Sequence, residues 1–226
     1  MVVTGFKPLD MLVEPSMRWW GVEFYGDYSI TSYILHHTLA FRSRFERIYL
    51  VMAQEFGGIR TDVLTKFCRV YECLLTNIYV VRVFSNSGLR TALSELIGLE
   101  DGLVVVAYPY NYLPRDHSKY FEASIISGLL RKVMQSKELI VFNTFTKFGT
   151  VMPEGGSMHH HVVKVIVMLR RCGGRVYATL VKHPAKPSGV TKSFHVKVLE
   201  DIVLMNYGRT LLEWVSNGLV RPAVHG

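Results

Sequence analysis

Residues 22–41 read VEFYGDYSITSYILHHTLAF, and this stretch decides the fold. The apolar run Val22–Tyr25 is typical of a strand. Gly26 marks a turn, and the apolar spacing of Thr31–Phe41 predicts a helix. A strand, a glycine turn and a helix in this order form the first unit of an α/β domain.

Strands and helices continue to alternate along most of the chain. Further strands are predicted at Arg47–Met52, Asn77–Val83, Leu103–Ala107 and Leu139–Phe142. Further helices are predicted at Arg60–Leu75, Gly88–Ile97 and Phe121–Met134. The run LVVVA at Leu103–Ala107 has no polar alternation, which is typical of a parallel sheet covered by helices on both faces.

In the last part of the chain, strands follow one another without helices between them. It contains three strand-like runs, at His161–Leu169, Val176–Lys182 and Ser193–Val198. The predicted fold class is therefore α/β, with a mainly parallel central sheet flanked by helices and with C-terminal antiparallel strands. We expect one domain over residues 1–226, closed by a helix at about 209–216.

The composition is that of a globular protein with a basic surface. Hydrophobic residues make up 49% and charged residues 19%, which excludes a disordered chain. No apolar run reaches the roughly 18–20 residues of a membrane span, and the start of the chain lacks signal-peptide features, so we expect a cytoplasmic protein. The net charge of +8 favours an acidic partner, most often nucleic acid, or else a basic surface without a role.

The chain has three cysteines, Cys68, Cys73 and Cys172. Their spacing matches no metal site, and an odd number does not pair evenly. We expect them to be buried thiols in a reducing compartment.

Residues 26–33 occupy the position of a phosphate-binding loop. Such a loop follows the pattern G-x-x-x-x-G-K-[ST], in which the Lys meets the outer phosphates and the hydroxyl holds Mg²⁺. Gly26 matches the first glycine, and Ser29 lies inside the loop. The second glycine, the Lys and the Ser/Thr are replaced by Thr31, Ser32 and Tyr33. The sequence therefore predicts a degenerate nucleotide site.

Several segments together resemble the ATPase core of the archaeal RadA/RecA-type recombinases, and in particular their shorter paralogues. In family order they are TGFKPLDML at Thr4–Leu12, EFYG at Glu23–Gly26, NIYVVR at Asn77–Arg82, GGSMHHHV at Gly155–Val162 and VKHPAKP at Val181–Pro187. The resemblance implies a RecA-like P-loop NTPase core. It runs from Thr4 to about Val198, and we expect the family's N-terminal helical domain to be missing.

The resemblance also shows what this chain lacks. The family's Walker B strand ends in an Asp that helps to hold Mg²⁺, and Ala107 stands there. Glu55 lies near the position of the family's catalytic Glu. With Lys, hydroxyl and Asp all missing, we expect no ATP hydrolysis and no cofactor. A cryptic nucleotide site is the alternative.

The resemblance places two DNA-binding loops, one after Leu103–Ala107 and one ending near Gly155. Arg115 and Lys119 in the first loop, and Lys147 in the second, are the expected DNA contacts. Aromatic residues interleaved with cations suit single-stranded DNA, although the first loop could equally be a structural cap on the sheet. The expected partners are DNA and a RadA-type recombinase.

The predicted function is that of a non-catalytic paralogue that supports homologous recombination and DNA repair. Two alternatives remain: an atypical ATPase completed by a partner subunit, and a pseudo-ATPase that acts only through protein contacts.

Three aromatic or histidine groups keep two interpretations each. Tyr28 and Tyr33 would either fill the emptied phosphate pocket or shape a rigid turn or pack in the core. Trp19-Trp20 belong in the core or an interface, and stacking on a nucleotide is the alternative. In His159-His160-His161, the outer two residues would share one face of a strand, but no ligand cluster lies nearby in sequence, so we expect no metal.

Overall fold

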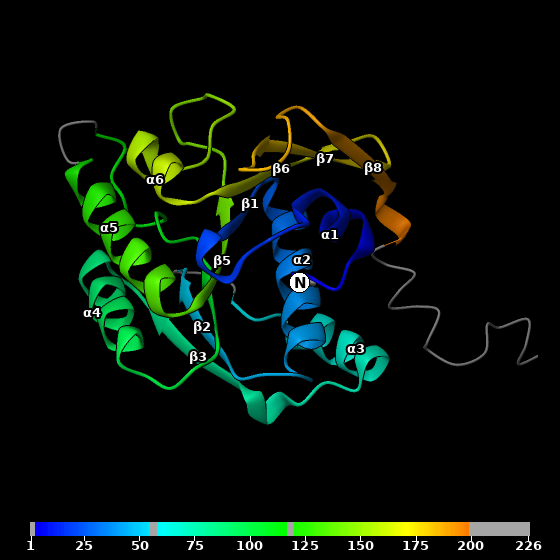
Figure 1. Cartoon of the computed structure of the whole chain (residues 1–226), viewed down its shortest axis with the longest axis horizontal. Coiled ribbons are helices and arrows are strands. Elements are labelled where there is room, and N and C mark those ends of the chain that lie inside the picture. The colour runs from blue at the N-terminus through cyan, green and yellow to red at the C-terminus, as the bar shows by residue number, and fades with distance from the viewer. Residues whose placement is uncertain (1–2, 55–57, 117–119, 199–226) are drawn as a thin grey trace, which may run out of the picture.

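The computed structural model describes residues 3–54, 58–116 and 120–198. Its core is an eight-stranded sheet in the order β3-β2-β4-β5-β1-β6-β7-β8 (Figure 1). The strands are β1 Val22–Gly26, β2 Ile48–Ala53, β3 Ile78–Val83, β4 Leu103–Ala107, β5 Glu138–Thr144, β6 Val165–Cys172, β7 Arg175–Lys182 and β8 Thr191–His195. β1 to β6 pair in parallel, whereas β7 and β8 are antiparallel. The predicted fold class is confirmed.

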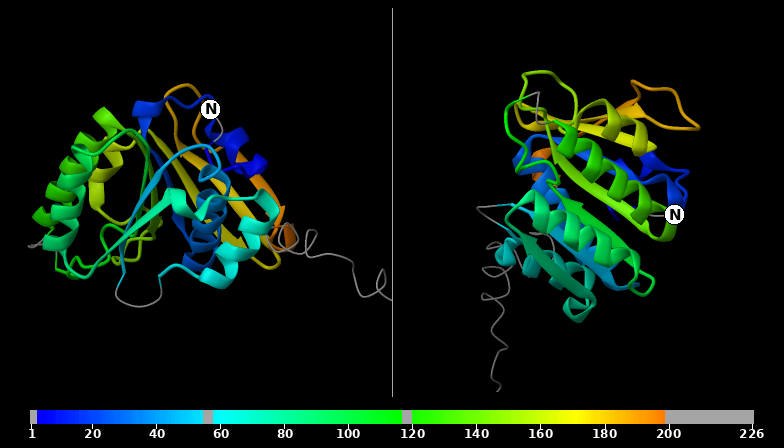
Figure 2. Two further views of the ribbon diagram at one scale, coloured as in Figure 1. Left: turned by 90° about the horizontal axis from the view of Figure 1, so that it is seen from below. Right: turned by 90° about the vertical axis from the view of Figure 1, so that its left-hand side faces the viewer.

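Helices cover both faces of this sheet (Figure 2). They are α1 Lys7–Val13, α2 Tyr28–Arg42, α3 Thr61–Tyr71, α4 Asn86–Ile97, α5 Phe121–Ser136 and α6 Gly156–Val162, with short 3₁₀ turns η1 Arg18–Trp20 and η2 Leu75–Asn77. Alternate side chains of β4 pack into the two helical layers, one on each face of the sheet. Leu103 and Val105 pack with α1 to α3, and Val104 and Val106 pack with α4 and α5. The central position of β4, between β2 and β5, confirms the expectation from its apolar sequence.

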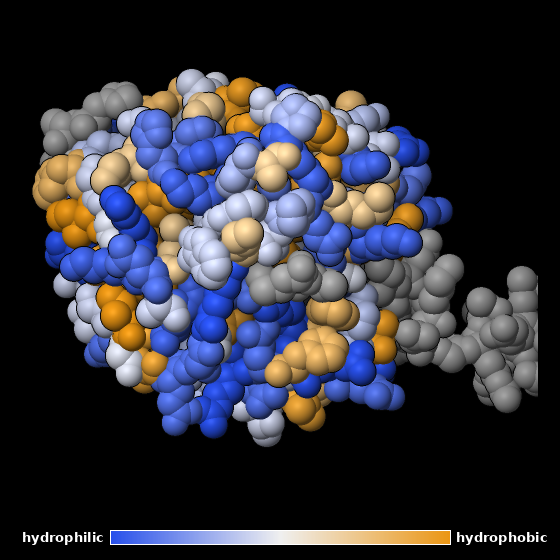
Figure 3. All heavy atoms as spheres, in the orientation of Figure 1, coloured by the Kyte–Doolittle hydropathy of each residue, from blue (hydrophilic) through white to orange (hydrophobic). Residues whose placement is uncertain are grey.

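The surface outside these layers is mixed. On the face drawn in Figure 3, apolar side chains are dispersed among hydrophilic ones. No helix in the described part of the chain is long and apolar enough to span a membrane. The helix predicted at 209–216 lies outside the described residues, as do Glu55 and Lys119.

The cysteine prediction was wrong. Cys68 and Cys73 form a disulfide across the end of α3, and Cys172 is exposed rather than buried. The helix predicted to reach Leu75 ends at Tyr71, because Glu72 adopts a left-handed backbone with φ 52°. That turn brings the two sulfurs together.

The segment before β6 also differs from the prediction. His159, His160 and His161 lie on helix α6 and not on a strand. Gly155 has φ 111° and precedes the helix, a backbone conformation that favours glycine. The strand itself begins later, at Val165.

Candidate functional site

The connection between β1 and α2 is a single residue, Asp27, because β1 ends at Gly26 and α2 begins at Tyr28. The Asp27 amide donates to the Leu169 carbonyl over 3.1 Å, and the Asp27 carboxylate accepts from the Arg171 amide at 2.5 Å. Both bonds tie the connection to β6. The helix therefore begins three residues before its predicted start at Thr31, and most of residues 26–33 form its first turns.

Of the residues that replace the phosphate-binding groups, two are buried and Tyr33 is half-buried. Thr31 is fully buried; its hydroxyl donates to the Tyr28 carbonyl over 3.1 Å and lies 3.3 Å from the Tyr108 hydroxyl. Ser32 is also buried. Tyr33 packs edge-on against Phe67 of α3, with ring centroids 5.3 Å apart.

Tyr108 occupies the place between the end of β4 and the start of α2. It follows the buried Ala107, has φ 58° and is 3% exposed. Its ring lies 5.1 Å from that of Tyr28, and burial raises the pKa of its hydroxyl. Gln54 donates to the Tyr28 hydroxyl over 2.6 Å. An aromatic pair thus lies next to Thr31 and directly after Ala107, two of the positions that replace phosphate and metal ligands.

Tyr28 and Tyr33 have different surroundings. The ring of Tyr28 lies tilted against that of Tyr108, whereas Tyr33 packs against the core. That either ring fills a phosphate pocket stays a prediction. Sequence reasoning missed Tyr108 because it placed that residue at the start of a DNA loop. One feature of the sequence could have indicated it: Tyr108 is an aromatic residue directly after Ala107, where the strand ends without a carboxylate.

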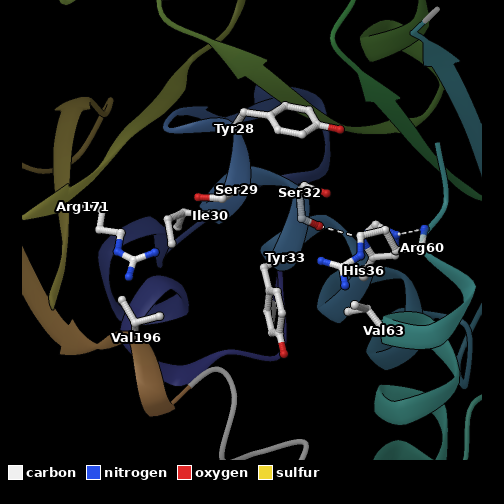
Figure 4. Close-up of a pocket in the computed structure, with 10 residues that line it drawn as sticks. All are labelled: Tyr28, Ser29, Ile30, Ser32, Tyr33, His36, Arg60, Val63, Arg171 and Val196. Atoms are coloured by element: carbon white, nitrogen blue, oxygen red, sulfur yellow. Dashed lines mark hydrogen bonds between the residues drawn. The ribbon is translucent and has the colours of Figure 1, made fainter. Parts of the chain in front are cut away.

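A cavity of about 300 Å³ lies beside the first turns of α2 (Figure 4). Arg60 and Arg171 line it from opposite sides, and Tyr33 lies between them. Of the residues that the structure describes, none that lines it carries a carboxylate. The described lining offers two cations and apolar surface.

His36 fixes one wall of this cavity. Its Nε2 accepts from the Arg60 amide over 2.7 Å, so its Nδ1 carries the proton and donates to the Ser32 carbonyl over 2.6 Å. Burial lowers the pKa of His36, which keeps the ring neutral. The neighbouring His37 is buried too, and its pKa is lowered to about 4. Both histidines are structural.

A buried polar network lies behind the two predicted DNA loops. Glu23 of β1 and His159 of α6 are fully buried, with Oε1 and Nε2 2.7 Å apart. His159 Nδ1 lies 2.7 Å from the Tyr110 hydroxyl, which in turn lies 2.9 Å from Ser127 Oγ. The network joins β1, α5, α6 and the segment after β4. Among the described residues there is no group of three His, Cys, Asp or Glu side chains that could hold a metal.

Lys147 holds the two loop segments together. Its ammonium donates to the carbonyls of Asn111 and Leu113, over 2.7 and 2.9 Å, and more weakly to that of Tyr110. Burial, and then the charge of Arg115, lower the pKa of Lys147. Arg115 itself is exposed. The structure thus brings two of the three predicted DNA contacts close together, but the Lys147 ammonium already has partners.

The aromatic residues of the second loop are half-buried. Phe145 packs edge-on against Tyr25 at 5.7 Å, and Phe148 packs against Tyr120 at 5.3 Å. Val151 and Met152 are more exposed, at 56% and 43%. The loop surface is therefore partly apolar.

The sequence and the structure were each compared with those of known proteins. No family model matches the chain, and no curated protein matches its sequence. The chain is similar to the crystal structure of the RadB recombinase, with a TM-score of 0.65 and 19% sequence identity. The match covers 87% of this chain and 96% of that one. At this identity the likeness establishes the fold alone, and that fold is RecA-like.

Proposed function

We propose that the chain is a non-catalytic RecA-like protein that binds DNA, a recombinase, or both, and that it supports homologous recombination and DNA repair. The observation that carries the proposal is the replaced nucleotide site on this fold. Tyr108 fills the end of β4, and α2 begins one residue after β1. The net charge of +8 supports an acidic partner.

We expect no saturable binding of ATP·Mg²⁺ in the micromolar range by calorimetric titration. The Lys that meets the outer phosphates and both groups that hold Mg²⁺ are missing, so ATP·Mg²⁺ lacks its usual partners in such a loop. Ser32→Lys alone is expected to leave hydrolysis absent, because Tyr33 and Ala107 still fail to hold Mg²⁺.

The control is a Ser32→Glu variant, which places a negative charge at the same point. If the parent bound ATP in the micromolar range and the Ser32→Glu variant did not, the proposal would be contradicted. Such binding would support the atypical ATPase instead, and activity would then be sought after mixing with a partner subunit.

DNA binding is expected to weaken steeply with salt, because phosphate contacts release counterions. For single-stranded DNA, Arg115→Ala/Lys119→Ala should reduce the slope of log affinity against log salt by about 1.4, at roughly 0.7 per contact. Fluorescence anisotropy of a labelled oligonucleotide, repeated at several salt concentrations, measures both the affinity and its salt slope. Lys192→Ala/Lys197→Ala, which removes two exposed charges on and just after the edge strand β8, is the matched control.

Lys147→Ala belongs in a separate variant. Because its ammonium bonds backbone carbonyls of the first loop, its loss would alter loop structure as well as charge. Equal salt slopes for the parent and the Arg115/Lys119 variant would mean that these loops are not the DNA surface.

The protein-contact alternative has an observation of its own. β3 is an edge strand, paired only with β2 in the described sheet. Its residues Tyr79, Val80 and Val81 are 42–49% exposed, and an apolar hollow of about 510 Å³ lies between it and α4. An exposed apolar edge suits addition of a strand from a partner. If the parent binds no DNA even at low salt, a recombinase contact at this edge becomes the favoured function.

A further inference from the structure

A second hollow, of about 390 Å³, lies between η1, α6 and the C-terminal half of α5. It shares no lining residue with the cavity in Figure 4. Its apolar surface includes Trp19 and Met158. Its nitrogen-bearing side chains are those of Arg131, His161 and Lys164. Among the described residues no carboxylate lines it, so its chemistry suits a ligand that is both flat and anionic.

Trp19 is the most unusual of these residues. The sequence predicted core or interface burial, yet the side chain is 63% exposed. The adjacent Trp20 is half-buried and packs edge-on against His183 at 5.5 Å. Single exposed apolar residues are common, so Trp19 alone indicates nothing. Its position at the rim of a cationic hollow is the informative feature.

The cations of this hollow are not neutralised by the protein. In the described part of the chain, no ion pair joins Arg131 or Lys164 to a carboxylate. Lys182 adds a further charge near Lys164, and it donates to the carbonyls of His160 and Val163 over 2.6 and 2.7 Å. Burial, and then the charge of Lys164, lower the pKa of Lys182. The lysines are thus close enough to repel each other, and an anion would relieve that repulsion.

We propose that this hollow binds single-stranded DNA, with one base stacked on Trp19 and the adjoining phosphates against Arg131 and Lys164. Bases of a duplex are stacked inside the helix and cannot reach an indole face, whereas unpaired bases stack readily on aromatic side chains. The inference rests on the DNA binding of the proposed function. It adds a contact on the α5–α6 face, apart from Arg115 and the Lys147 segment.

The first experiment uses Trp19 as its own reporter. The chain has three tryptophans, so Trp20→Phe/Trp214→Phe leaves Trp19 as the single emitter. Titration with an unlabelled oligo-dT strand is expected to quench its emission in a saturable way. Unchanged emission, while anisotropy of a labelled oligo-dT reports binding, would overturn the inference.

The second experiment measures affinity for the same oligo-dT. Trp19→Ala is expected to weaken binding about tenfold, within the range found for loss of one base stack, and Trp19→Phe to retain most of it. Arg131→Ala/Lys164→Ala is expected to lower the salt slope by about 1.4. Lys192→Ala/Lys197→Ala, with the same loss of charge, is expected to match the parent.

The outcomes separate this inference from the proposed function. If only the Arg115/Lys119 variant weakens binding, the hollow is not a DNA site and the proposed function stands. If only the Trp19 and Arg131/Lys164 variants do, the inference is supported and the loop contacts are wrong. A parent that fails to bind oligo-dT at low salt overturns both. Trp19 emission that responds to a recombinase and not to oligo-dT would assign the hollow to a protein partner and overturn the inference.

Discussion

Gly26→Ala is expected to destabilise the fold by roughly 2–5 kcal/mol. Gly26 has φ 142°, and a Cβ there would lie 1.9 Å from the Leu169 carbonyl oxygen of β6. The estimate adds overpacking of about 1–3 kcal/mol to a left-handed backbone cost of about 1–2 kcal/mol. The clash is with backbone, so relief requires β1 and β6 to move apart. Urea denaturation of the two proteins measures the difference.

Gly149→Ala is the matched control for the backbone term. Gly149 also has a positive φ, at 80°, but nothing lies within 4 Å of its would-be Cβ. It should therefore lose only the strain cost, about 1–2 kcal/mol. If the two variants lost equal stability, close packing against Leu169 would not be the reason for a glycine at position 26.

His159→Ala is expected to cost about 3–5 kcal/mol, the range found when one partner of a buried pair is removed. It would leave the fully buried Glu23 with Asn143 Nδ2, 2.8 Å from its Oε1, as its remaining partner. The other carboxylate oxygen, Oε2, already has none in the structure. Denaturant unfolding, followed by circular dichroism, gives the free-energy change.

The double variant Glu23→Leu/His159→Leu tests the reason. Replacing both members of a buried pair by apolar groups is often nearly neutral, so this variant should recover much of the stability that His159→Ala loses. A loss below about 1 kcal/mol for His159→Ala, within the range of an ordinary hydrogen bond, would mean that the pair is not an important support of the loops.

The sequence predicted the central sheet well because burial on both faces leaves a continuous apolar run. Leu103–Ala107 is such a run, and it lies in the middle of the parallel sheet. The start of α2 was harder to predict. Asp27 and Ser29 are typical turn residues, yet the Asp27 carbonyl accepts the amides of Ile30 and Thr31 and begins the helix.

The candidate site was predicted only in part, because its decisive contacts are long-range. The sequence shows the three positions that depart from the phosphate-loop pattern, Thr31, Ser32 and Tyr33. The role of Tyr108 depends on Thr31 and Tyr28 lying beside the end of β4. Lys147 donates hydrogen bonds to backbone carbonyls. Every residue has such a carbonyl, so the sequence does not indicate which ones Lys147 contacts.

The disulfide between Cys68 and Cys73 closes a very short loop, with a sequence separation of 5. A cross-link stabilises chiefly by removing freedom from the unfolded chain, and the gain grows with the logarithm of loop length. For a loop of this size the chain-entropy estimate is only about 2 kcal/mol. Opening the bond would therefore release one helix end and leave the sheet, with its two apolar layers, to hold the fold. The architecture is supported by burial in either oxidation state.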